Sequence, residues 1–291
     1  MRILPNLGAV QPYKTIMGNF LPSLLDFYRN PADYALEPFR IYGNLYYVGD
    51  KKVCSHLIDT GDGLILFDTG YQHTAHLLVD SIYKLGFRPE DIKIIIHSHG
   101  HFDHFGAGND FRKLYGCRIY MSRTETELLR QEPRRALMHL NPCPHASICW
   151  PDHEIEDYEV ITLGNTSIRC VPAPGHTHGT MAFFFPVTQD GVTLTAGYWG
   201  GAGFLTVYKD YCKEYDLPQD LCEQMKDTIG RLDREQVDIC LGNHPGQNCN
   251  TERRAQMLQD PSHNPFIDSA YWHDFLAIQE RKRKDFEALG Y

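Results

Sequence analysis

Short apolar runs alternate with amphipathic stretches along this chain, and the alternation predicts a mixed α/β protein. Residues 91–96 form an apolar, β-branched run that is typical of a buried strand. Residues 74–85 carry leucine and isoleucine at helical spacing and stop before Gly86, which indicates a helix and its end. Residues 110–115 predict a further helix, and residues 118–121 predict a further strand. Alternating strands and helices of this kind build layered α/β folds.

Several pairs of apolar segments predict antiparallel hairpins, because a turn of glycine with asparagine or aspartate joins the two members of each pair. The pairs are 39–42 with 45–48, 55–60 with 64–68, 160–163 with 166–173, and 181–187 with 192–196. A last strand is predicted at 236–241. Residues 124–140 have a charged helical pattern, and residues 20–28 fit one or two helical turns.

A run of histidines, HSHGHFDH at residues 97–104, follows the predicted strand 91–96. His99 and His101 are two residues apart in an extended loop and can direct both rings at one metal ion. Asp103 and His104 come next and can face a second ion. Imidazole suits zinc or iron, and a carboxylate adds a hard oxygen ligand. Clustered surface histidines without a metal are the alternative, but the position just past a strand favours a metal site.

This motif resembles the signature of the metallo-β-lactamase superfamily. The resemblance implies an α/β fold with four layers, an αβ/βα metallo-β-lactamase sandwich that holds metal between its two sheets. It covers about residues 39–246. We therefore expect a hydrolase domain at 39–291 and an N-terminal extension at 1–38 that packs on this domain. The extension could lie over the mouth of the site or form a loose arm.

The resemblance also supplies the remaining ligands. His176 lies in a Gly-His-Thr sequence like that of the superfamily and becomes the third ligand of the first metal. Many members place a bridging aspartate in the stretch that corresponds to 197–203, but this chain has no acid there, and Tyr198 is the nearest match. His244 follows the strand 236–241 at the same face and can replace that ligand. The implied metal ligands, His99, His101 and His176 with Asp103, His104 and His244, resemble the third subclass of metallo-β-lactamases.

Asp68 ends the strand at 64–68 within a sequence similar to the superfamily's Asp-x-Gly motif. An acid at this place fits a hydrogen-bond partner for a ligand histidine. An aspartate that caps the following helix is the alternative. His178 follows the second ligand loop and could contact a substrate or face solvent.

The implied chemistry is hydrolysis by two Zn²⁺ ions, with iron and manganese as open alternatives. Asp103 would orient the nucleophile, and Tyr198 would either donate a hydrogen bond to the oxyanion or serve as a packing aromatic. The expected substrate is a small molecule, a cyclic amide of the β-lactam type. The alternative is a cytoplasmic hydrolase of another lactone, ester or amide with weak β-lactamase activity. An iron oxygenase of the persulfide-oxidising type is less favoured, because such enzymes typically have the acid that is absent from 197–203 here. A non-enzymatic scaffold is less favoured, because it would not need a complete set of metal ligands.

The composition of the chain limits the kinds of binding partner and the cellular location that we expect. The 291 residues carry a net charge of −9, which weighs against nucleic-acid binding and against RNA processing. There is no apolar run near 18 residues, so we expect no membrane span. The first twelve residues lack an apolar core and a small-residue cleavage site, so we expect a cytoplasmic protein. The oligomeric state stays open.

Three further segments carry polar residues without a firm role. The nine cysteines are odd in number and scattered, which suits reduced thiols. Cys143, His145 and Cys149 could form a second metal clip, although a structured loop at the rim of the site is the preferred interpretation. His73 and His76 are expected on the surface. The charged helix near 273–289 is expected to present a solvated face.

Overall fold

Two β-sheets face each other in this computed structural model, which describes residues 2–143 and 145–290. The first sheet has seven strands in the order β1-β2-β3-β4-β5-β6-β7, and the second has five in the order β12-β11-β10-β9-β8. The first sheet consists of β1 (Phe39–Tyr42), β2 (Leu45–Tyr47), β3 (His56–Asp59), β4 (Leu64–Phe67), β5 (Ile92–Ile96), β6 (Arg118–Ser122) and β7 (His153–Ile155). The second consists of β8 (Val160–Leu163), β9 (Thr166–Pro172), β10 (Met181–Gln189), β11 (Val192–Trp199) and β12 (Ile239–Leu241).

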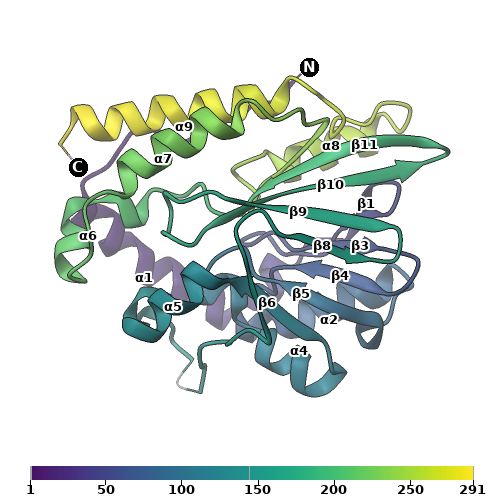
Figure 1. Ribbon diagram of the computed structural model, residues 1–291, viewed down its shortest axis with the longest axis horizontal. Helices are drawn as coiled ribbons and strands as arrows, with labels where there is room; N and C mark the ends of the chain where they lie inside the picture. Colours follow the sequence, from purple (N-terminus) through teal and green to yellow (C-terminus); the bar gives the residue numbers. More distant parts are fainter. Residues whose placement is uncertain (1, 144, 291) are drawn as a thin grey trace.

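Helices cover the outer faces of both sheets. The α-helices are α1 (Tyr13–Arg29), α2 (Ala75–Lys84), α3 (Phe102–Phe105), α4 (Gly108–Tyr115), α5 (Arg123–Gln131), α6 (Lys209–Glu214), α7 (Leu221–Leu232), α8 (Asn250–Gln259) and α9 (Tyr271–Ala288). The short 3₁₀ helices are η1 (Pro31–Tyr34), η2 (Gln72–Thr74), η3 (Pro89–Asp91), η4 (Pro133–Ala136), η5 (Met138–Leu140) and η6 (Leu205–Val207). Helices α7 and α9 lie on the five-stranded sheet, and α2 and α4 lie on the seven-stranded sheet (Figure 1). The predicted four-layer αβ/βα sandwich is therefore confirmed.

The period of two along the strands builds two separate cores. In β4, Leu66 belongs to the core beneath the helices, whereas Ile65 and Phe67 belong to the core between the sheets. The Phe67 ring lies 5.0 Å from that of Phe183 on β10, so the two sheets interlock through aromatic side chains. Full burial of one such side chain stabilises the fold by roughly 1.5–3 kcal/mol.

Strand direction brings the ligand loops to one edge. β4, β5 and β6 run parallel, and β11 runs parallel to β12. The loops that follow β5, β9 and β12 carry residues 97–104, His176 and His244. Polar residues from both sheets therefore meet at the edge where α/β proteins place ligands.

The N-terminal extension differs from the expectation of one or two turns. Helix α1 spans 17 residues and contains Pro22. Leu24 and Phe27 are buried in the core beneath the helices. Packing of this apolar face stabilises a helix that its proline would weaken, and tertiary contacts commonly decide such cases. The helix also encloses His73, whose ring stacks on Tyr28 with 3.7 Å between centroids, so the surface position expected for His73 is wrong. His76 is exposed, as expected.

Two other helices were predicted only in part. The helix expected over 124–140 ends at Gln131, because Pro133 begins a separate 3₁₀ helix. Helix α9 exposes Arg281 and Lys284 to solvent, as expected, but Arg283 is buried and donates to Glu280. Among the described residues, no helix has the length and apolarity needed to cross a membrane.

Candidate metal centre

The histidine loop begins where β5 ends, and its side chains turn inward. His99, His101 and His104 are 0%, 3% and 0% exposed. His101 lies directly before the short helix α3, which carries Asp103 and His104. Strand β5, in which every residue except the exposed Lys93 is buried, therefore delivers a cluster of polar rings into the interior. Such a cluster is stable only if its nitrogens have partners.

The first ligand group consists of His99, His101 and His176. The Nε2 atoms of His99 and His176 each lie 3.0 Å from Nδ1 of His101. Ligand nitrogens on a tetrahedral zinc ion are about 3.3 Å apart when each bond is about 2.0–2.1 Å. The three rings thus converge on a point where one ion fits.

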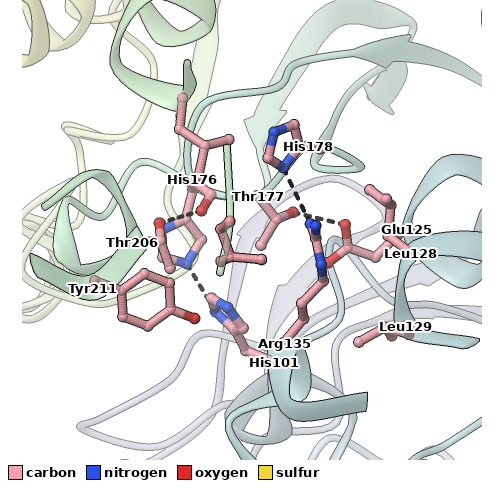
Figure 2. A pocket seen from close by; sticks show the side chains of 12 residues that line it. His101, Glu125, Leu128, Leu129, Arg135, His176, Thr177, His178, Thr206 and Tyr211 are labelled. Atoms are coloured by element: carbon pink, nitrogen blue, oxygen red, sulfur yellow. Dashed lines mark hydrogen bonds between the residues drawn. The ribbon is translucent and has the colours of Figure 1, made fainter. Parts of the chain in front are cut away.

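Backbone carbonyls fix the rings of this first group. Nδ1 of His99 lies 2.8 Å from the carbonyl oxygen of Gly200, and Nδ1 of His176 lies 2.9 Å from that of Gly203. A donor proton on Nδ1 leaves the Nε2 lone pair facing the ion position. A Cβ atom at Gly203 would lie 3.1 Å from the His176 ring, so a small residue permits this close approach. The hydroxyl of Thr206 also donates to the carbonyl of His176 (Figure 2).

The second ligand group consists of Asp103, His104 and His244, whose donor atoms also lie close enough to share an ion. The Asp103 Oδ2 atom lies 3.4 Å from Nε2 of His104 and 3.7 Å from Nε2 of His244. Nδ1 of His244 lies 2.7 Å from the carbonyl oxygen of Lys52. Nε2 of His104 is buried without a hydrogen-bond partner, as expected for a nitrogen reserved for a metal.

Asp68 contacts the second group through His104, on the side away from the ligand atoms. Its carboxylate accepts hydrogen bonds from the amide and the hydroxyl of Ser98, both at 2.8 Å, and lies 2.9 Å from Nδ1 of His104. The predicted contact between Asp68 and a histidine of the metal loop is therefore confirmed, and the role of His104 as a ligand stays a prediction. Burial alone would raise the pKa of Asp68, but His104 and the hydrogen bonds hold it below its usual range.

Burial also sets the protonation of the ligand rings. It lowers the pKa of His176 to about 4, and it lowers the pKa values of His99 and His101 well below the usual value. These rings are therefore neutral near pH 7 and offer lone pairs to a metal. Burial favours the neutral ring of His104 as well, but Asp103 and Asp68 raise its pKa.

Tyr198 lies behind the ligands, away from the position expected of an oxyanion donor. Its side chain is 0% exposed, and its hydroxyl donates to Asp68 at 2.5 Å. The phenol has one proton, and Asp68 already accepts it. In this structure Tyr198 contacts a partner of a ligand histidine, and its ring packs among the side chains between the sheets.

Glu125 is a functional candidate that the sequence reasoning missed. Its Oε1 atom accepts from the Gly100 amide at 2.7 Å, and its Oε2 atom accepts from the Gly179 amide and the Thr177 hydroxyl, both at 2.9 Å. It therefore joins the loop of His99 and His101 to the loop of His176. A signal was present, because Ser122 and Glu125 have the S-x-x-E spacing of a helix capping box, and the Ser122 hydroxyl accepts from the Glu125 amide.

The proposed cysteine clip receives no support. Cys149 is buried, and the Cys143 thiol donates to Gln72 at 3.3 Å. His145 is exposed, and none of the three belongs to a possible metal-ligand group within the described residues. Each of the nine cysteines is unpaired, in agreement with the expected reduced thiols.

Comparisons with known proteins agree with this geometry. Residues 48–190 match the family model described as "Metallo-beta-lactamase superfamily". The native FEZ-1 metallo-beta-lactamase from Legionella gormanii superposes with a TM-score of 0.76 at 27% identity, over 88% of this chain and 96% of that chain. The metallo-beta-lactamase GOB-18 from Elizabethkingia meningoseptica superposes with a TM-score of 0.76 at 27% identity, over 88% of this chain and 94% of that chain. An N-acyl homoserine lactonase from Bacillus thuringiensis is 28% identical in an alignment of length 190 that covers 56% of this chain and 65% of that protein.

Proposed function

The chain is a member of the metallo-β-lactamase superfamily, as its histidine motif predicted, and from this premise we propose that it hydrolyses a cyclic amide of the β-lactam type at a centre of two zinc ions. The observation that carries the proposal is the pair of adjacent three-ligand groups. Similarity to two metallo-beta-lactamases over most of their length supports the substrate class.

The residues fit a metal pair. His99, His101 and His176 would hold one ion, and Asp103, His104 and His244 would hold the other. The unpartnered Nε2 atom of His104 supports this assignment. When bound, zinc would polarise the substrate carbonyl and lower the pKa of water to near 7. Iron or manganese could occupy the same nitrogen and oxygen ligands.

The chain's own side chains would then orient the reactants. The Asp103 side chain is 16% exposed, so its carboxylate can accept a hydrogen bond from the attacking water and aim the oxygen lone pair at the carbonyl. Asp68 and the Lys52 carbonyl keep His104 and His244 in one orientation. Tyr198 would act by holding Asp68, since its hydroxyl does not reach the ligand groups.

A second candidate is the hydrolysis of a lactone, ester or other amide, with weak β-lactamase activity. The similarity to an N-acyl homoserine lactonase favours it. The same ligand groups would serve either bond, because a lactone and a lactam present similar carbonyls to an attacking water.

Metal analysis and turnover on one preparation test the proposal. We expect two zinc ions per chain, turnover of nitrocefin and a carbapenem, and loss of both activities in His244→Ala. His263→Ala is the matched control, because this histidine is exposed and distant in sequence from the ligand loops. Two zinc ions with lactone turnover alone would favour the second candidate. One iron ion per chain would overturn both.

A further inference from the structure

A small hollow adjoins the first ligand group. His101 and His176 form one wall, and Figure 2 shows Arg135 reaching toward His178 at the opposite side. Apolar side chains form much of the remaining wall, namely Leu128, Leu129, Tyr211, Leu217 and Leu221, and the polar residues Glu125, Thr177 and Thr206 complete it. Its open space is about 20 Å³, enough for one small group of a ligand. A substrate at the ligand groups could therefore place one substituent here.

Arg135 lacks an anionic partner within the described part of the chain. Its Nη1 atom lies 3.4 Å from Nδ1 of His178, and its Nε atom is buried without an acceptor. The acids nearby are already engaged. Glu125 accepts from two backbone amides and a hydroxyl, and Asp220 lies 3.0 Å from Nε2 of His178. A buried donor without an acceptor costs free energy, so this guanidinium is suited to an incoming anion.

We propose that Arg135 binds a carboxylate of the substrate and so selects anionic substrates over neutral ones. The planar guanidinium can donate two parallel hydrogen bonds to a carboxylate. The leucine side chains lower the local dielectric constant, which strengthens this charge-assisted pair. His178, held by Asp220, would steady the guanidinium from its far side. The chain carries a net charge of −9, so a cation without a counter-ion beside the ligand groups is a specific feature and not part of a general positive surface.

The proposal rests on the proposed hydrolase function. It also distinguishes between the two candidate reactions, hydrolysis of a β-lactam and hydrolysis of a neutral lactone. A β-lactam drug carries a carboxylate close to the scissile amide, whereas an N-acyl homoserine lactone is neutral. A carboxylate anchored at Arg135 lies next to His101 and His176, on the side of the first ligand group. Arg135 would therefore lower KM for carboxylate-bearing substrates and leave KM for neutral lactones unchanged.

The first test is steady-state kinetics of Arg135→Gln with nitrocefin and N-hexanoyl homoserine lactone. Loss of a charged hydrogen bond should raise KM for nitrocefin about 10- to 100-fold, with kcat little changed. The lactone should show no change in KM. Arg135→Lys should restore part of the loss, because it keeps the charge without the planar fork. Arg134→Gln is the matched control, since Arg134 is exposed and lies over the Tyr215 ring.

The second test does not require turnover. Calorimetric titration of the zinc-loaded protein with phenylacetate should give a Kd about 10-fold weaker in Arg135→Gln than in the wild type and in Arg134→Gln. If the wild type hydrolyses neither substrate, the proposed function fails, while this titration still decides the role of Arg135. Equal affinity in all three proteins would mean that a carboxylate binds elsewhere, and it would overturn the proposal.

Discussion

The two ligand groups lie side by side but differ in exposure. His99, His101 and His176 are only 0%, 3% and 8% exposed, so the first group is largely buried. In the second group, the side chains of Asp103 and His244 are 16% and 35% exposed. We infer from this contrast that the first group holds its ion rigidly, whereas the second group is more accessible to solvent and substrate.

They also differ in how they are held. The first group depends on backbone carbonyls, those of Gly200 and Gly203, and on Glu125, which joins its two loops. The second depends largely on the side chains around Asp68. A hydrogen bond to a backbone carbonyl survives most substitutions of the residue that carries it, whereas a single substitution can remove a hydrogen bond between side chains. The comparison therefore gives three predictions.

The largest expected effect is loss of activity on metal removal. We expect a chelator to abolish hydrolysis and to empty the second group before the first, because Asp103 and His244 are open to solvent. Residual metal per chain and activity should be measured during dialysis, with added zinc restoring both. Release of both ions in a single step would contradict the contrast between the groups.

An intermediate effect is expected from Glu125→Gln, which acts on the first group alone. The new amide nitrogen cannot accept from the Gly100 or Gly179 amides, so one loop loses its anchor. We expect affinity for the first metal to fall about 10- to 100-fold. Cobalt titration followed by absorption would measure each site.

Glu127→Gln is the matched control for this prediction, because Glu127 is exposed on the same helix. If Glu125→Gln lowered thermal stability but left both metal affinities intact, Glu125 would be structural and would not position the ligands.

The smallest effect is expected from Tyr198→Phe. Removal of the hydroxyl leaves Asp68 one donor short and loosens His104, so kcat should fall roughly fivefold, equivalent to about 1 kcal/mol. The exposed Tyr158 provides the control variant Tyr158→Phe. A much larger loss, on the scale of a ligand deletion, would restore a direct role for the Tyr198 hydroxyl in the reaction.

The strands and the ligand loops were predictable because their signals are local. Apolar runs that end in glycine turns located the hairpins, and the histidine spacing located the metal loop. Asp68 was predicted because an acid at a strand end beside such a loop fits a histidine partner, and because its sequence is similar to the Asp-x-Gly motif. The fold brings all six predicted ligands together in the two groups, while their binding of metal stays a prediction.

The remaining features depend on the tertiary structure. Lys52 and Gly200 contribute carbonyls, which every residue has, so no sequence signal marks them. The direction of Tyr198 could have been inferred from the period of two along β11, since Trp199 points to the core beneath the helices and Tyr198 to the core between the sheets. Helix α1 was predicted only in part, over 20–28, because Pro22 interrupts its helical pattern.

Each ligand group draws on both sheets. The loop after β5 supplies two members of each group, and the five-stranded sheet supplies the third, His176 or His244. Neither half of the chain can form a complete group before the sheets dock, so the folding transition state would contain at most part of either group. Bound ions should consequently slow unfolding far more than they speed refolding. The metal centre would then also act as a kinetic lock that prolongs the lifetime of the folded protein.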